Sequence, residues 1–177
     1  FIKHDVIYNE LCNHIPANLK FKELYFQTKK ELCIVGTNVS LEQCELFDYK
    51  RTPEMNVIDA ICISLSVPFL FQKYVYNNNV YVDGCVSMNY PWNVFNVKDT
   101  QKLGISLNSL CNSTDDDFFK FSQKILNILL NEKQLYNNNT LCINIDFPFM
   151  KEYTKEDILY LYTFGQTSAY KWLKKVK

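Results

Sequence analysis

A short apolar run that ends in an acid and a glycine, Val80–Gly84, constrains this chain more than any other segment. Alternating valine and tyrosine favour a β-strand, so the carboxylate of Asp83 is expected at the carboxyl end of that strand. Open α/β sheets place their chemistry at this end of their strands. An Asp-Gly pair is also an ordinary way to begin a tight turn. The run therefore predicts either a catalytic carboxylate or a simple turn.

Two flanking segments carry a family resemblance. The apolar stretch Val57–Phe71 contains a Ser-Leu-Ser-Val-Pro step, and Asn89-Tyr90-Pro91 follows the acid. This order resembles the patatin-like phospholipase family, in which a helix ending in a Ser-x-Ser-x-Pro-like turn leads to a strand with Asp-Gly-Gly or Asp-Gly-Ala, then Asn-x-Pro. The resemblance covers about residues 21 to 172, and its specific motifs lie between Pro53 and Pro91.

The resemblance implies a role for each motif residue. Asp83 matches the catalytic aspartate of the family's serine–aspartate dyad, where it is the base that accepts the serine proton. The supporting residues are expected to be Gly84, Asn89 and Pro91 in the aspartate loop and Ser64, Ser66 and Pro68 in a structural turn beneath it. Gly84 can adopt a positive φ and let another backbone approach closely. Cys85 replaces the family's usual glycine or alanine and puts a side chain beside the base.

The nucleophile of that dyad has no counterpart in the sequence. The family's Gly-x-Ser-x-Gly elbow needs glycines on both sides of a serine, and none of the four glycines flanks a serine in that way. The Gly-rich segment that supplies oxyanion-hole amides is absent too. We therefore expect residues 1–177 to be the carboxyl-terminal portion of a single patatin-like domain. The serine is expected in a missing amino-terminal segment, which would leave this chain inactive alone.

The order of apolar segments predicts an α/β fold with a mixed, mainly parallel sheet flanked by helices and incomplete at its amino-terminal side. Strands are expected at residues 32–35, at 42–49 as an edge strand, at 103–107 and at 141–145, and residues 72–82 are expected to form a hairpin with Asn77–Asn79 at its tip. Helices are expected at 5–15, at 21–30, from Thr52 or Pro53 through 62, and from Thr154, where Thr154 and Asp157 resemble a capping box. The strand at 103–107 is expected to be buried. Gly165, inside the last helix, suggests a kink or close packing against a neighbour. Asp115–Asp117 is expected to begin a helix rather than to bind calcium.

Composition limits the partners. A formal net charge of zero gives no long-range attraction to nucleic acid. The longest apolar stretch is shorter than the roughly 20 residues of a bilayer span. Seven cysteines without Cys-x-x-Cys spacing, and two histidines on an expected surface helix, His4 and His14, indicate no metal site and a reducing, cytoplasmic location. The resemblance implies no metal or organic cofactor, and a lipid or phospholipid substrate met at a peripheral membrane surface.

Three functions follow from these observations. The preferred one is a lipid acyl hydrolase of phospholipase A type with Asp83 as base. The second is a non-catalytic family member that binds lipid or protein, which Cys85 and the absent elbow support. The third is an unrelated α/β interaction module in which the Asp-Gly pair is only a turn.

Overall fold

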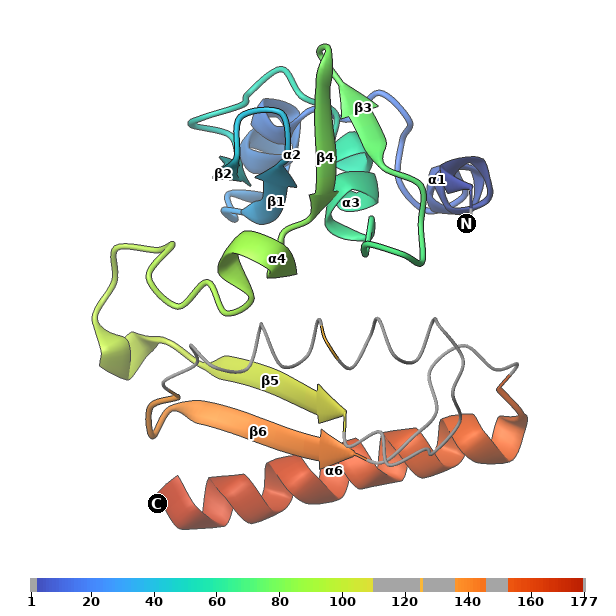
Figure 1. Ribbon diagram of the computed structural model, residues 1–177. Coiled ribbons are helices and arrows are strands. Elements are labelled where there is room, and N and C mark those ends of the chain that lie inside the picture. The colour runs from blue at the N-terminus through green and yellow to red at the C-terminus, as the bar shows by residue number, and fades with distance from the viewer. Residues whose placement is uncertain (1–2, 110–124, 126–135, 146–152, 177) are drawn as a thin grey trace. The chain divides into compact units, whose positions relative to one another are not determined.

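The computed structural model describes residues 3–109, 125, 136–145 and 153–176 (Figure 1). Contacts between residues divide the chain into two compact units. The first holds the described residues up to 94 together with residue 125, and the second holds the described residues from 95 to 109 and from 136 onward. Each unit has its own sheet, of four strands in the first and two in the second.

The first unit is built on an antiparallel sheet in the order β2-β1-β4-β3. Its strands are β1 (Ile34–Asn38), β2 (Gln43–Phe47), β3 (Tyr74–Tyr76) and β4 (Asn79–Asp83). The hairpin between β3 and β4 turns at Asn77 and Asn78, whose φ angles of 46° and 64° lie in the left-handed region that asparagine tolerates. The structure thus confirms the predicted hairpin and the edge position of β2.

Two helices, α2 (Phe21–Thr28) and α3 (Val57–Ser64), form the core with this sheet. A third helix, α1 (His4–Cys12), has no buried residue and lies beside α3 (Figure 1). Five of the eight residues of α3 are buried. The side chains that pack together in the core of α2, α3 and the sheet are those of Phe21, Phe47, Met55, Val57, Ala60, Ile63 and Tyr81. Gly36 lets α3 lie directly on β1, because a Cβ there would lie 2.7 Å from Cγ2 of Ile63.

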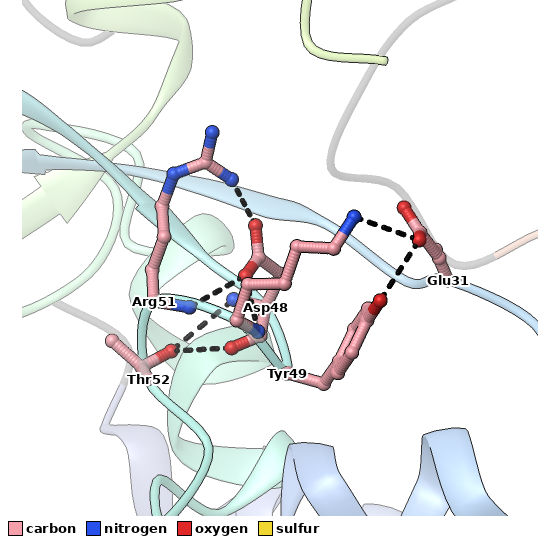
Figure 2. A network of polar contacts seen from close by, with 6 residues as sticks. Glu31, Asp48, Tyr49, Arg51 and Thr52 are labelled. Atoms are coloured by element: carbon pink, nitrogen blue, oxygen red, sulfur yellow. Dashed lines mark hydrogen bonds and ion pairs between the residues drawn. The ribbon is translucent and has the colours of Figure 1, made fainter. Parts of the chain in front are cut away.

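A hydrogen-bonded turn organised by Asp48 lies between β2 and α3 (Figure 2). The Asp48 side chain is only 6% exposed, and its Oδ1 accepts the backbone N–H groups of Lys50 and Arg51, both at 2.8 Å. The Arg51 guanidinium pairs with the same carboxylate. Thr52 also belongs to this turn, because its N–H donates to the Asp48 carbonyl at 2.9 Å. The predicted helix start at Thr52 or Pro53 is therefore wrong, and α3 begins at Val57.

The second unit contains a parallel pair of strands and a long helix. Strands β5 (Gly104–Ser109) and β6 (Thr140–Ile145) pair in parallel, and α6 (Lys155–Val176) packs on β6. A short 3₁₀ helix, η1 (Asp99–Gln101), precedes β5. The predicted capping box of α6 is confirmed, since the Thr154 N–H donates to Asp157 Oδ2 at 2.9 Å and the Asp157 N–H donates to Thr154 Oγ1 at 3.1 Å.

One expectation about the second unit is wrong, and one of the two alternatives for Gly165 is excluded. The strand expected to be buried, β5, leaves Ile105 60% and Leu107 69% exposed, while Leu141 on β6 is buried. Helix α6 contacts β6, and the apolar side chains of β5 stay exposed. Among the described residues, no atom outside the neighbouring backbone of its own helix lies within 4 Å of the position that a Cβ on Gly165 would occupy, so Gly165 is not a point of close packing. The kink that the sequence also suggested there stays a prediction.

The structure confirms the α/β class, with helices packed on a mixed set of strands. Three strand pairs among the described residues are antiparallel and one is parallel. Strands joined by short turns, as β1–β2 and β3–β4 are, can only pair antiparallel. The expected helix start at Asp115–Asp117 lies outside the described residues. None of the helices in the described ranges is long and apolar enough to cross a membrane.

Candidate active site

Asp83 ends β4 and stands directly before the short helix α4 (Cys85–Met88). Two hydrogen bonds hold its backbone. Its N–H donates to the carbonyl of Ser66 at 2.9 Å, and the hydroxyl of Thr37 on β1 donates to the Asp83 carbonyl at 2.9 Å. The residue is therefore fixed between the turn after α3 and the neighbouring strand, and its side chain starts from a defined place.

The Asp83 carboxylate is half-buried, and its Oδ1 accepts the backbone N–H of Cys85 at 2.7 Å. Burial raises the pKa of Asp83 above its ordinary value, and hydrogen bonding from Cys85 opposes this rise. No ion pair to Asp83 is found within the described ranges. A carboxylate without a cationic partner and with a raised pKa is a better proton acceptor than an ordinary aspartate.

Cys85 places a neutral thiol beside this carboxylate. Burial, followed by the charge of Asp83 and hydrogen bonding to it, raises the pKa of the Cys85 thiol far above its ordinary value. The nucleophilic form of cysteine is the thiolate. The thiol therefore stays protonated at neutral pH and is not a nucleophile there.

Gly84 serves close packing and not an unusual backbone angle. Its φ is −62°, so the predicted use of a positive φ is wrong. The expected close approach is present instead, because a Cβ on Gly84 would lie 2.4 Å from the carbonyl oxygen of Val35. The start of α4 thereby lies directly against the backbone of β1 at Val35.

The turn after α3 lies under the aspartate loop. Ser64 is the last residue of α3 and is half-buried. Ser66 is 1% exposed, and its hydroxyl donates to the Cys62 carbonyl at 2.7 Å. A hydroxyl so enclosed is not available to a substrate, whereas the Ser66 carbonyl holds Asp83. Pro68 is half-buried in the same turn.

Asn89 and Pro91 lie beyond α4 and are both exposed. Asn89 follows the last residue of α4 with helical angles, φ −67° and ψ −28°. The Pro91 carbonyl accepts the N–H of Val94 at 3.3 Å. No hydrogen bond joins either side chain to Asp83 in the part of the chain that the structure describes, so their support of the loop stays a prediction.

His4 lies on α1, which has no fully buried residue, as expected of a surface helix, but His4 itself is half-buried and has contacts that the sequence did not predict. Its Nε2 lies 2.6 Å from the carbonyl oxygen of Gln72 and 3.3 Å from the Ser66 hydroxyl. Its ring contacts the rings of Phe71 and Tyr74. His14 is exposed and lies 3.5 Å from Glu10. Hydrogen bonds join neither histidine to Asp83, which is consistent with a base that works without one.

Sequence reasoning missed the parts played by Thr37 and Ser87. The Thr37 hydroxyl, besides donating to Asp83, lies 2.8 Å from the hydroxyl of Ser87 on α4. The two side chains also line an open groove of about 350 Å³ with Asn38, Val39, Glu42, Gln43, Cys44, Val82 and Val86. Thr37 lies opposite Cys44 on β2 and opposite Val82 on β4. The sequence does not give the order of the strands, so it could not predict that these residues line one groove. Within the described ranges, no three His, Cys, Asp or Glu residues are grouped to hold a metal ion.

The raised pKa of Asp83 predicts a pH-dependent effect on stability. Because the folded state disfavours the charged carboxylate, ionisation costs stability as pH rises above the unfolded pKa, near the ordinary value of 3.8. Asp83→Asn removes that charge and keeps an oxygen that accepts the Cys85 N–H. We expect the variant to have the higher free energy of unfolding at pH 7, with the difference disappearing below pH 3.8. Urea unfolding of both proteins at the two pH values measures this, and a less stable variant at pH 7 would contradict it.

The family model for "Patatin-like phospholipase" matches residues 2–96 of this chain, which is more than half of its 177 residues. The chain belongs to the patatin-like phospholipase family. This membership removes the third possibility, an unrelated interaction module. The matched residues end close to Val94, where the first part of the first unit also ends, so the family assignment covers the unit that carries Asp83.

Two viral proteins are similar to this patatin-like chain over part of their length. "Probable lipid hydrolase 463L" of Invertebrate iridescent virus 6 is 34% identical over 77 residues, which cover 44% of this chain and 27% of the relative. "Uncharacterized protein R571" of Acanthamoeba polyphaga mimivirus is 30% identical over 96 residues, which cover 54% of this chain and 32% of the relative. The chain thus matches about a third or less of the length of these relatives.

A solved structure shows the same fold. The crystal structure of VipD from Legionella pneumophila superposes with a TM-score of 0.64 at 17% identity, over 89% of this chain and 35% of VipD. At this identity the likeness concerns the fold alone. It extends over more of the chain than the family match does, and so includes described parts of the second unit.

Proposed function

We propose that this patatin-like chain is part of a lipid acyl hydrolase of phospholipase A type, in which Asp83 is the base of a serine–aspartate dyad. The observation that supports this most is the state of the Asp83 carboxylate. It is half-buried, has a raised pKa, lacks an ion-pair partner among the described residues, and ends a strand whose backbone is fixed on both sides. The printed name of the iridescent virus relative, a probable lipid hydrolase, agrees with this substrate class.

The proposed reaction has two steps. The serine hydroxyl attacks the ester carbonyl carbon while its proton passes to Asp83, and the alcohol of the lipid leaves with that proton. Water then attacks the acyl-serine ester, again losing a proton toward Asp83, and the fatty acid and the free serine are released. A well-placed base contributes typically 10²–10⁴-fold to such a step.

The serine is proposed to lie in a segment that precedes residue 1 of this chain. The groove beside the Asp83 loop is proposed to take the acyl chain, because the side chains of Val39, Val82 and Val86 give it apolar walls. We propose a cytoplasmic protein that meets its lipid at a peripheral membrane surface.

A second candidate is a non-catalytic family member that binds lipid or protein. The position of Cys85 favours it, because Cys85 puts a side chain beside the carboxylate that would accept the serine proton, and its backbone N–H already donates to that carboxylate at 2.7 Å. In that case Asp83 would still shape the loop, and no acyl-serine would form.

Hydrolysis by a longer chain tests the proposal. The protein is produced once as the 177 residues and once extended on its amino side to the first methionine of its reading frame. Fatty acid release from phosphatidylcholine vesicles is then measured. We expect release by the extended protein and none by the 177 residues. A folded extended protein without release would favour the binding function.

A further inference from the structure

Thr37 on β1 places a buried hydroxyl against the backbone of Asp83. Thr37 is only 8% exposed, and its hydroxyl donates to the Asp83 carbonyl at 2.9 Å. The register of the two strands sets Thr37 opposite Val82 and Gly36 opposite Asp83. The Thr37 side chain therefore reaches past its own partner to the last residue of β4. This side-chain bond is additional to the pairing of the strands, and it acts at the point where β4 ends.

The hydroxyl of Ser87 on α4 supports the Thr37 hydroxyl. The two oxygens are 2.8 Å apart. A threonine hydroxyl has one hydrogen, and a carbonyl oxygen can only accept. The Thr37 hydrogen is therefore used at Asp83, and Ser87 donates to Thr37. The Ser87 oxygen also lies 3.5 Å from the Gly84 carbonyl, which is a longer and weaker contact. The two hydroxyls thus form a chain that ends on the Asp83 carbonyl, and hydrogen bonds in such a chain strengthen one another.

The carbonyl that Thr37 holds belongs to the peptide group between Asp83 and Gly84. Because a peptide group is planar and rigid, fixing its oxygen restricts the direction in which the chain continues to Cys85. The Cys85 N–H in turn donates to Oδ1 of Asp83 at 2.7 Å. The place of the carboxylate therefore depends on the Cys85 N–H, and the place of this N–H depends on the peptide group that Thr37 holds.

We infer that Thr37 is a positioning residue for the Asp83 carboxylate, which it acts on by fixing the following peptide group with the support of Ser87. The effect on hydrolysis rests on the proposed function, because a base must lie within hydrogen-bond reach of the proton that it accepts. A misplacement of about 1 Å can cost about 10²-fold in rate. Thr37 takes no proton itself, since its hydroxyl is already bonded to Asp83 and Ser87.

Amide hydrogen exchange in the 177-residue chain tests the positioning without any catalysis. Thr37→Val removes the hydroxyl and keeps the branched shape of the side chain. We expect the Cys85 N–H to exchange about tenfold faster in this variant, because a hydrogen bond that holds the loop is lost. The Thr52 N–H is the reference. It donates to the Asp48 carbonyl at 2.9 Å in the turn after β2, and its exchange should not change.

Fatty acid release by the extended protein tests the consequence for the reaction. Thr37→Val should lower kcat at least about tenfold and leave KM within about twofold. Thr37→Ser keeps the hydroxyl and should restore kcat and the slow exchange to within about threefold of the unchanged protein. Ser87→Ala keeps the bond to Asp83, so its effect should be smaller, about threefold. Thr28→Val is the matched control, because the Thr28 hydroxyl also donates to a backbone carbonyl, that of Leu24 at 2.7 Å, and the variant should behave as the unchanged protein does.

Three results would overturn the inference. They are unchanged exchange at Cys85 in Thr37→Val, equal acceleration at Cys85 and Thr52, which would mean a general loss of stability, and a Thr37→Ser protein as impaired as Thr37→Val. Fatty acid release that Thr37→Val leaves intact would also count against the positioning alone. Faster exchange at Cys85 only, with no release even by the unchanged extended protein, would count against the proposed function and not against the positioning.

Discussion

If Asp83 is the base proposed above, we expect Asp83→Asn to lower fatty acid release by about 10²–10⁴-fold in a protein that also carries the serine. Asparagine keeps the volume of the side chain and the oxygen that accepts the Cys85 N–H, so the loop is expected to stay in place. It cannot take a proton from the serine hydroxyl. The effect should therefore appear in kcat at saturating lipid and leave KM nearly unchanged, as expected when a group acts mainly in the transition state.

A second carboxylate in the same unit provides the control for this variant. Asp59 on α3 is half-buried and accepts a hydrogen bond from the Tyr74 hydroxyl at 2.7 Å. Asp59→Asn keeps an acceptor for that hydroxyl and should leave kcat within about twofold, because Asp59 is given no part in the reaction. Equal rates for Asp83→Asn and the unchanged protein, with both folded, would refute the role of Asp83 as base.

Gly84→Ala should destabilise the chain by about 3 kcal/mol, at the upper end of what an added methyl group costs in a packed site. Its Cβ would lie 2.4 Å from the carbonyl oxygen and 2.6 Å from the carbonyl carbon of Val35. These are backbone atoms within β1 and cannot rotate away, so the loop or the strand must move. Urea unfolding gives the change in free energy, and hydrolysis by the extended protein should fall as well because Asp83 is the adjacent residue.

Gly165→Ala is the matched control for this change. Among the described residues, no atom outside the neighbouring backbone of α6 lies within 4 Å of the Cβ that it would add, and the site is inside α6. Alanine is favoured over glycine in a helix interior by about 1 kcal/mol, so this variant should be more stable than the unchanged chain. A Gly84→Ala protein as stable as the Gly165→Ala protein would show that the approach of Val35 is not a constraint.

Local patterns predicted the local structure well. The Thr154 capping box and the asparagine turn at Asn77 were readable because the interacting atoms are close in sequence. The start of α3 could not be predicted in this way. Thr52 donates to the Asp48 carbonyl and so belongs to the turn after β2, and the position of that turn depends on where β2 ends. The expectation that residues 1–177 form part of a single domain stays a prediction, because the family match reaches only residue 96.

In the candidate site too, features encoded by neighbouring residues were predicted, whereas contacts between residues distant in the sequence were not. The motif around Asp83 pointed to the family and to a carboxylate at a strand end, because a short run of residues encodes both. Sequence reasoning could not foresee that His4 would lie against Gln72, or that Thr37 would hold the Asp83 carbonyl. These contacts join residues that are 68 and 46 positions apart.

The sequence by itself determined the family, the acid and most of the helices and strands, since these follow from side-chain order over a few neighbouring residues. The tertiary structure alone decided the environment of Asp83: its burial, its raised pKa, the thiol beside it and the backbone that fixes it. The physical reason is that the proton affinity of a carboxylate depends on the water it has lost and the donors around it. Both are set by the packing of segments that are distant along the chain.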